Sequence, residues 1–525
     1  MSTLKNTVAI LLSLTLIICI TNGASAASSS NIPLGSYIYV ELERLELKGL
    51  IKSGILSSKP FSRIEGARLI REAVIESETP EFRDKSGYQA ILERLKHEFA
   101  PELRGPIEAV NVTPLESGYV TFLHSSMDPA HITNNNNGDK YFAGKNALAA
   151  FTSKAAFYDT VTVVVEPQTQ LNNVNSEIDL LNAYGLFDVW GIELEIGRDS
   201  LWWGSGENGA LIISNNAQPF NMVKLTSTES FELPWIFKYL GQFKPVVFYS
   251  NLGTDYQTIP NTEFCGLRLD FKPFQEFQFG LSRTMMFGGD GRATMGLTQW
   301  WNAWWVNPVQ EHYSTTYNNK QYASMDAAFT YTNQTSFLPF SGIRIYTEWG
   351  AVDSRSLKGN TGTVVNPDGF AFILGALIDQ PANIEGLDLR IEVGDTAMNA
   401  RYSLWYSAGV YTTGYTNMGR VIGDAMGGNS ENLYIRGQYH LDNGAVFGIE
   451  YEGVSNGIWP VTSTYTPYNE NNSVKLKTDW FGGDISYPIS EYLTLQGGIG
   501  YETMSSTITN QKGIAIWTTL RLMHI

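Results

Sequence analysis

The sequence predicts a transmembrane antiparallel β-barrel of about 18 strands, preceded by a small N-terminal helical domain. Three observations support this fold class. Charged residues make up 17% of the chain and aromatic residues 13%, whereas a soluble protein normally carries about 25% charged residues. From about residue 118 onward, apolar and polar residues alternate with a period of two. Short turns also alternate with long polar connections, as they do in outer-membrane barrels.

The first residues have the features of an export signal. Lys5 provides a positive charge, residues 8–20 form an apolar run, and Ala24-Ser25-Ala26 is a cleavage site of small residues. We therefore expect residues 1–26 to be a signal peptide. An uncleaved anchor is the alternative, although the run is shorter than the ~20 residues that a spanning helix needs. No later stretch is apolar for long enough to span as a helix, so a membrane assignment rests on strands.

The segment after the signal has the ~3.6-residue period of amphipathic helices. Ser62 and Glu65 form a capping box at the start of the second of three expected helices, and Pro101 ends the third, which begins near Tyr88. We assign residues 27–110 to a helical domain in the periplasm, which either plugs the lumen or meets a partner. Its polar surface is either a contact face or simply solvated, and it carries five arginines, Arg63, Arg68, Arg71, Arg83 and Arg94.

Residues 111–525 are expected to form the barrel. Between Leu387 and Val393, for example, apolar residues alternate with Asp388, Arg390 and Glu392. Both signs of charge occupy the polar face, which suits a lumen in which an arginine pairs with a carboxylate on the next strand. A barrel in lipid turns its apolar side chains outward and its polar ones inward. A soluble all-β fold, which would bury the apolar face instead, remains the alternative.

The strand number and the barrel ends follow from the same pattern. About 420 residues at roughly 23 per strand and connection give about 18 strands, an even number as expected. Asn443-Gly444 predicts a two-residue hairpin, and Val474, Leu476 and Trp480 are expected on the apolar face of one strand. Residues 514–525 are expected to close the barrel, although the chain ends in Ile525 and not in an aromatic residue.

Several function classes receive no support from the sequence. The formal net charge of −16 argues against a nucleic-acid partner, because binding one needs concentrated Lys and Arg. Signal cleavage removes Cys19 and leaves Cys265 alone, so we expect no disulfide and no zinc held by cysteines. The histidines form no His-x-x-x-His pair, and no Gly-x-Ser-x-Gly elbow occurs. We expect no cofactor, no metal, no catalytic residue and no enzymatic activity, while a barrel enzyme acting on lipid or glycan remains a third reading.

The most unusual segment is residues 197–220, which reads Gly-Arg-Asp-Ser-Leu-Trp-Trp-Gly-Ser-Gly and continues to Ser-Asn-Asn-Ala-Gln-Pro-Phe. It resembles the Wzi-type capsule assembly family, whose members carry a Gly-Arg-x-x-x-Trp-Trp-Gly-x-Gly run followed by Ser-Asn-Asn-Ala-x-Pro. The opening Pro33-Leu34-Gly35-Ser36 is also similar to that family's N-terminal segment. The resemblance implies an 18-stranded outer-membrane barrel with a helical bundle at its periplasmic mouth. It further implies a lectin that anchors capsular or extracellular polysaccharide at the cell surface.

Two groups of residues are candidate glycan contacts. Aromatic faces stack on sugars, and Arg, Asp and Asn hydrogen-bond to hydroxyls. The first group lies in the unusual segment and comprises Arg198, Asp199, Trp202, Trp203, Asn215 and Asn216. Its alternative is a structural role, in which the segment folds into the lumen. The second group lies in an expected long loop and comprises Trp300, Trp301, Trp304 and Trp305. It forms either a carbohydrate platform or part of an aromatic girdle at the lipid interface.

The expected function is thus an outer-membrane, lectin-like barrel that organises polysaccharide at the cell surface. Its expected partners are capsular or extracellular polysaccharide, outer-membrane lipid and the barrel assembly machinery. A porin or solute channel is the alternative from a different class. The two differ in the lumen, because a porin needs an open aqueous path and a lectin barrel does not.

Overall fold

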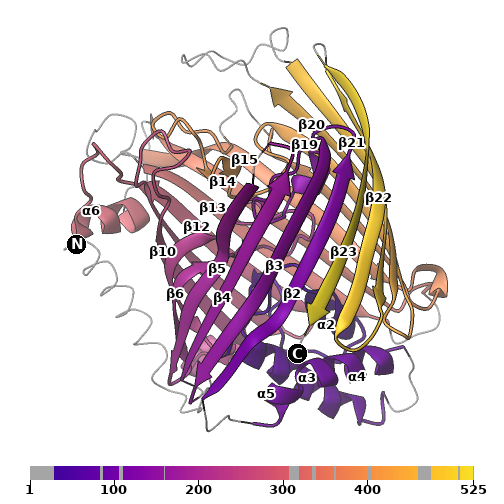
Figure 1. The fold of residues 1–525 in the computed structure, drawn as a ribbon. Coiled ribbons are helices and arrows are strands. Elements are labelled where there is room, and N and C mark those ends of the chain that lie inside the picture. The colour runs from indigo at the N-terminus through magenta and orange to yellow at the C-terminus, as the bar shows by residue number, and fades with distance from the viewer. Residues whose placement is uncertain are drawn as a thin grey trace.

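The computed structural model describes most of the chain (Figure 1). The described residues are 29–82, 87–105, 110–158, 160–174, 176–306, 319–333, 338–359, 362–398, 405–458, 474–506 and 509–523. The expected signal peptide at residues 1–26 and the arginine at position 83 lie outside them.

In the described residues, 18 antiparallel strands close into a barrel. The last strand pairs with the first, from Ser117 opposite Met523 to Ser125 opposite Ala515, so the predicted closing strand and the predicted strand number are confirmed. The strands β8 and β9 lie one after the other along β10. The barrel strands are β2 (Asn111–Ser125), β3 (Gly144–Phe157), β4 (Val161–Asn172), β5 (Ser176–Val189), β6 (Ile192–Asp199), β8 (Phe220–Ser227), β9 (Phe231–Glu232), β10 (Gln242–Asn251), β11 (Glu263–Phe274), β12 (Phe277–Phe287), β13 (Asn319–Thr332), β14 (Gly342–Gly359), β15 (Gly362–Asp379), β16 (Leu387–Asp395), β19 (Ser430–His440), β20 (Val446–Ile458), β21 (Val474–Pro488), β22 (Leu493–Ser505) and β23 (Asn510–Met523).

The period of two places apolar side chains outside and ionic ones inside. On β20, Ile449 is 72% exposed on the outer wall, whereas Glu450 next to it points inward and pairs with Arg436 of β19 at 2.6 Å. Strand β21 departs from the expected pattern. Trp480 is buried in the lumen, where its indole N–H donates to Glu450 at 2.9 Å, and Phe481 takes the outward position. The expectation for Trp480 was wrong because a buried indole N–H needs an acceptor, which lipid does not provide.

The connections differ between the two barrel ends. At one end they are mostly short, such as residues 190–191 and 275–276; we call this the turn end. At the other, the loop end, they are long, as at residues 252–262 and 396–429. The expected two-residue hairpin at Asn443-Gly444 is a three-residue loop instead, because Leu441 bonds to Ala445 across it. Gly444 takes a φ of +85° there, a conformation that favours glycine.

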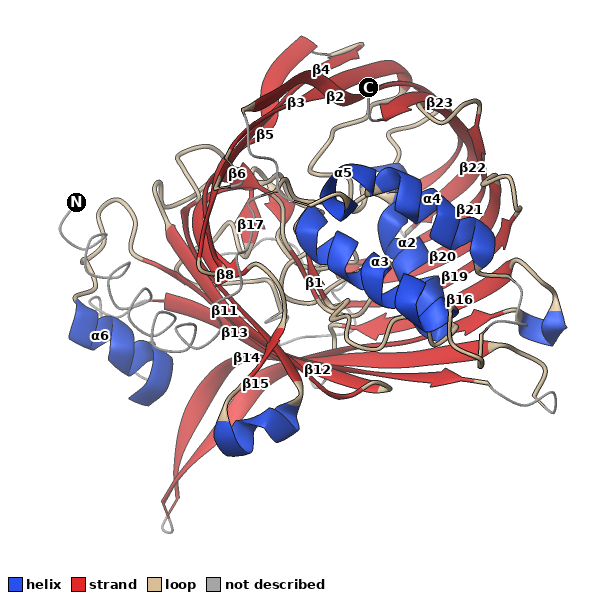
Figure 2. Ribbon diagram, turned by 90° about the horizontal axis from the view of Figure 1, so that it is seen from below, coloured by secondary structure: helices blue, strands red, loops and turns tan. Residues whose placement is uncertain are grey.

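A small helical segment fills the mouth of the barrel at the turn end (Figure 2). Ser62 caps its second helix by accepting from the Glu65 N–H at 3.2 Å, as expected. The chain turns helical again around Pro101, beyond the expected end. The helices are α2 (Tyr37–Leu47), α3 (Arg63–Ser77), α4 (Gln89–Glu98) and α5 (Ala100–Leu103). Their apolar faces share a buried core that includes Leu42, Leu69 and Leu95.

Short elements complete the described fold. They are β1 (Ser58–Lys59) with β7 (Trp202–Trp203), β17 (Thr416–Asn417) with β18 (Arg420–Val421), α6 (Leu297–Trp301), and the turns η1 (His131–Thr133), η2 (Trp235–Leu240), η3 (Asn302–Val306) and η5 (Pro381–Asn383). None of the helices in the described ranges is long and apolar enough to cross a bilayer. The expected domain boundary at residue 110 lies beside residues 106–109, which are not described, and the division into two domains stays a prediction.

Candidate functional site

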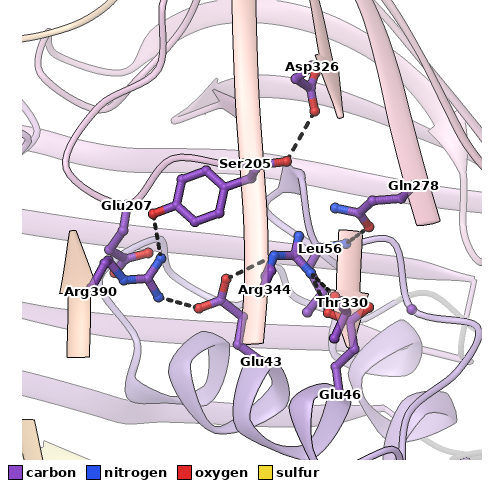
Figure 3. A network of polar contacts seen from close by, with 12 residues as sticks. Glu43, Glu46, Leu56, Ser205, Glu207, Gln278, Asp326, Thr330, Arg344 and Arg390 are labelled. Atoms are coloured by element: carbon purple, nitrogen blue, oxygen red, sulfur yellow. Dashed lines mark hydrogen bonds and ion pairs between the residues drawn. The ribbon is translucent and has the colours of Figure 1, made fainter. Parts of the chain in front are cut away.

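The face of α2 that enters the barrel is charged and yet buried. Glu46 pairs with both Lys272 of β11 and Arg344 of β14, and Glu43 pairs with Arg390 of β16 at 2.6 Å (Figure 3). Burial alone would raise the pKa of Glu43, but Arg390 and Arg344 outweigh it and hold that pKa below its ordinary value. Removing one partner of such a buried pair typically costs about 3–5 kcal/mol. The helical segment is therefore held firmly in the mouth.

Two further ion pairs extend this contact around the mouth. Lys48, just after α2, lies 2.7 Å from Asp379 of β15, and Arg44 lies 3.0 Å from Asp388 of β16. His440 of β19 reaches the same Asp388 at 3.0 Å. The charged residues of α2 and Lys48 thus pair with lumenal charges on one part of the wall, from β11 to β16.

The arginines expected on the outer polar surface of the helical segment are mostly paired within it. Arg63 is buried and lies 2.8 Å from Glu98 and 2.5 Å from Glu102. Arg68 lies 2.8 Å from Glu65. Arg63 is therefore not part of the outer surface, whereas a contact face formed by the other arginines stays a prediction.

The unusual segment between β6 and β8 folds into the lumen as an inward loop, residues 200–219. Trp203 bonds through its backbone N–H to the Ile213 carbonyl at 3.0 Å, and the Gly204 N–H bonds to the Ser57 carbonyl at 2.9 Å. The second contact extends the pairing of β1 with β7, so the loop is attached to the helical segment. Leu211 and Ile213 have no exposed surface and lie in an apolar core inside the barrel.

Carboxylates of the barrel wall hold the inward loop by its backbone. Glu392 of β16 accepts from the backbone N–H groups of Glu207 at 2.8 Å and Asn208 at 3.1 Å. Glu348 of β14 accepts from the Leu211 N–H at 3.0 Å. The lumenal face of the wall therefore supplies acceptors for a loop that has few partners within itself.

A second loop, residues 405–427, covers the inward loop from the loop end. The Tyr406 hydroxyl donates to the Leu211 carbonyl at 2.7 Å, and Tyr415 stacks on Tyr406 with ring centroids 6.0 Å apart. Asp424 is buried below, and this burial raises its pKa to about 8, although it accepts a hydrogen bond from the Met426 N–H. The lumen is therefore packed with aromatic and aliphatic side chains at this level.

A third loop, between β2 and β3, is anchored inside the barrel by a histidine. His131 stacks on Trp480 at 4.4 Å between ring centroids and lies 3.2 Å from Glu452. The Glu502 carboxylate of β22 accepts from the backbone N–H of His131 at 3.1 Å. Three loops from the loop end thus bend into the lumen.

The structure brings the first group of predicted glycan contacts together, mostly in buried positions. Asp199 accepts from the Asn31 side chain at 2.8 Å, and Arg198, the most exposed of the group, reaches Gln218 at 3.0 Å. Trp202 and Trp203 are buried. The Asn215 carbonyl accepts from Asn137 at 2.7 Å, and the Asn216 side chain donates to the Val421 carbonyl at 2.9 Å. The contacts shown are internal, and glycan binding by these residues stays a prediction.

The second predicted group lies on the outside of the barrel, near the loop end (Figure 1). Trp300 and Trp304 are buried against Cys265 and Met285 of the outer wall, and Trp301 is 41% exposed. Arg283, which points outward from β12, donates to the Trp304 carbonyl at 2.5 Å. The side chain of Trp305 lies outside the described residues. The segment α6–η3 therefore covers an outward-facing arginine, and its use as a carbohydrate platform stays a prediction.

Sequence reasoning expected ion pairs between lumenal strands, but it missed the ion pairs that α2 makes with them and one exposed aromatic residue. Nothing in the sequence of α2 distinguishes Glu43 and Glu46 from solvated helix residues. Tyr256, in the loop between β10 and β11, is 59% exposed, and Lys140 lies over its ring at 5.1 Å. Lys140 covers one face of this ring, so a sugar would contact the rest of its exposed surface. Within the described ranges, no three His, Cys, Asp or Glu side chains gather as a metal site.

The fold and its filled lumen define a plugged outer-membrane β-barrel. The chain belongs to the family of capsule assembly protein Wzi, which matches residues 116–513. The sequence is 28% identical over 145 residues to an uncharacterized 55.8 kDa protein in the cps region of Klebsiella pneumoniae, and this match spans 27% of the chain and 28% of the relative's length.

The solved structure of a capsule assembly protein shows the same fold. Wzi of Escherichia coli, described as an outer membrane protein involved in group 1 capsule assembly and a carbohydrate-binding β-barrel, superposes with a TM-score of 0.69 at 18% identity. The superposition covers 94% of this chain and 99% of that one. OccD3 of Pseudomonas aeruginosa superposes with a TM-score of 0.44 at 10% identity, covering 80% and 95% of the two chains.

Proposed function

We propose that this protein holds capsular or extracellular polysaccharide at the surface of the outer membrane without chemically changing it. The observation that carries the proposal is a lumen filled by the protein's own helical segment and inward loop, in a chain of the capsule assembly family. A barrel whose lumen holds its own helical segment and inward loop is suited to present a surface and not to conduct solutes. The carbohydrate-binding description of the E. coli relative supports this reading.

The proposal includes an orientation. Outer-membrane barrels have short turns on the periplasmic side and long loops outside the cell. We therefore place the turn end with the helical segment in the periplasm and the loop end at the cell surface. Strand β23, which closes the ring with β2, would be the segment presented to the barrel assembly machinery.

Tyr256 and Lys140 form the glycan contact that we propose at the loop end, together with exposed Trp301 on the outer wall. For the buried residues from Arg198 to Asn216 we propose an indirect contribution, through the shape of the inward loop. Direct glycan contact by those residues would require the loop to leave the lumen, against its bonds to Glu348 and Glu392.

A deletion strain complemented with variants tests the proposal. Cell-bound and released polysaccharide are measured after gentle washing. We expect deletion to shift polysaccharide into the medium, and Tyr256→Ala to reproduce part of that shift. The matched control is Tyr239→Ala, which removes a tyrosine 73% exposed at the turn end and leaves retention unchanged. Normal retention in the deletion strain would contradict the proposal.

Conductance in planar bilayers tests the alternative of a porin. The filled lumen predicts that the wild-type protein conducts poorly. Large and steady single-channel currents would contradict the closed barrel and favour a solute channel.

A further inference from the structure

An apolar groove lies on the outer wall of the barrel over strands β16 and β19 to β23. Its volume is about 740 Å³, within the range of about 300–1,000 Å³ in which protein pockets enclose organic ligands. The lining is almost wholly apolar, and its outward-facing members include Gly437, Ile449, Tyr451, Phe481, Gly483 and Ile499.

Two glycines create the hollow. Gly437 of β19 and Gly483 of β21 lie on either side of Ile449 on β20. A Cβ atom added at Gly483 would have no neighbour nearer than the Gly448 carbonyl oxygen at 3.8 Å, and one at Gly437 only Ile449 at 3.6 Å. The space beside these glycines is therefore open, and a larger side chain at either position would fill it.

Positive charge lies directly beyond the groove, toward the loop end. Lys475 and Lys477 of β21 and Lys512 of β23 are exposed on the outer face. The carboxylate among them on β21–β23 is Asp479, which lies 3.1 Å from Lys477 and accepts from the Tyr451 hydroxyl at 2.8 Å. Among the described residues, further exposed carboxylates nearby are Glu431 on β19 and Asp128, which directly follows β2 beside β23. Lysine is thus in excess above the groove.

The order of groups along β20, β21 and β22 matches that of a membrane lipid. The lysines come first at the loop end, then Tyr451, Phe481 and Tyr501, which are register partners at one level, and then Gly483 and Ile499. A lipid whose anionic headgroup meets the lysines would lay an acyl chain along the apolar groove. Lysines beside a membrane attract anionic headgroups in this way.

We propose that this groove binds a phosphorylated, acylated glycolipid of the outer leaflet, with a phosphate against Lys512 and a chain beside Gly437 and Gly483. The choice of leaflet rests on the proposed function, which places the loop end outside the cell. A second copy of the chain is the other occupant that an apolar wall can take, but the excess of like charge above the groove disfavours self-association.

Native mass spectrometry of the full-length protein, extracted from outer membranes in mild detergent, tests the proposal. The probes are the copurified phosphoglycolipid and added phosphatidylglycerol. We expect wild type to retain the glycolipid. Gly483→Leu and Lys512→Glu should each lower the lipid-bound fraction about fivefold or more, as expected for losing one favourable contact of this kind.

Two matched controls lie elsewhere on the outer wall. Gly185→Leu fills an outward glycine of β5, where an added Cβ has its nearest neighbour at 3.6 Å. Lys238→Glu reverses an exposed lysine at the turn end. Both should retain the glycolipid.

Three outcomes would overturn the proposal: equal lipid retention in all variants, preference for phosphatidylglycerol over the glycolipid, or a wild-type dimer that Gly483→Leu dissociates. Surface labelling of a cysteine placed at Tyr256 on intact cells reports the orientation separately. An incorrect orientation or a lack of polysaccharide retention can therefore be distinguished from a lack of glycolipid binding by the groove.

Discussion

The helical segment and the inward loop both occupy the lumen, but they are held there by different interactions. At the turn end, α2 is held by buried ion pairs such as Glu46 with Lys272 and Arg344. Toward the loop end, the inward loop is held by an apolar and aromatic core around Leu211 and Tyr406. Ion pairs define position and orientation, because each charge must find its partner, whereas apolar packing supplies stability roughly in proportion to buried area. The comparison suggests that the helical segment is located by charge and the inward loop is stabilised by packing.

The largest loss of stability is expected from removing Glu46, because its carboxylate pairs with two cations. Glu46→Ala leaves both Lys272 and Arg344 without their shared carboxylate and should lower the free energy of unfolding by about 3–5 kcal/mol. Denaturant unfolding in detergent, followed by tryptophan fluorescence, measures it. Glu78→Ala, which removes an exposed carboxylate just after α3, is the control and should change little. Equal effects of the two variants would contradict the importance of the ion pairs.

The corresponding change in the apolar core is Leu211→Ala. Leu211 has no exposed surface, and removing its side chain should cost about 2–5 kcal/mol, the range found for buried leucines. Because packing carries no charge, this loss should be the same at low and high salt. A loss that disappears at high salt would contradict the apolar character of this core.

Asp424 should make the stability of the apolar core around Leu211 fall as the pH rises from about 4 to about 8. Its pKa is raised to about 8 by burial, so the stability that depends on its protonated form is fully present below the unfolded-state pKa of about 3.9. That stability is lost as the pH rises through about 8. Asp424→Asn should therefore stabilise the protein at pH above 8 and change it little near pH 4. Thermal unfolding at several pH values measures this, and identical pH profiles would contradict it.

The smallest loss of stability is expected from breaking an ion pair that lies outside the lumen. Lys52 lies 2.6 Å from Glu76 on the helical segment, but its side chain is 40% exposed. Water screens such a pair, so Lys52→Ala should cost about 0–1 kcal/mol. A cost comparable to that of Glu46→Ala, measured in the same unfolding experiment, would show that burial is not what distinguishes the lumenal pairs.

The alternation of apolar and polar residues predicted much of this fold, because a barrel strand in lipid must turn apolar side chains outward and polar ones inward. The alternation of Ile449 with Glu450 follows from hydrocarbon on one side and a polar lumen on the other, and the cap at Ser62 follows from backbone geometry alone. Trp480 was placed on the wrong face because only the folded barrel shows that Glu450 is within reach of its indole.

The candidate site was less predictable from sequence. The segment around Trp202 and Trp203 was identified as unusual, and both a structural and a sugar-binding role were open. Its burial depends on partners far away in the chain, such as Ile422 and Glu392. The charges of α2 give no local signal either, since the strands that neutralise them follow more than 200 residues later.

The pairing of β1 with β7 has a consequence for biogenesis. The helical segment precedes every barrel strand in the chain, yet it is joined by backbone hydrogen bonds to a loop that lies inside the finished ring. The ring itself closes only when β23 meets β2. An insertion route that completed an empty cylinder first would have to thread a folded bundle into a narrow opening afterwards. The helical segment must instead bind to the incomplete barrel and become enclosed when β23 pairs with β2.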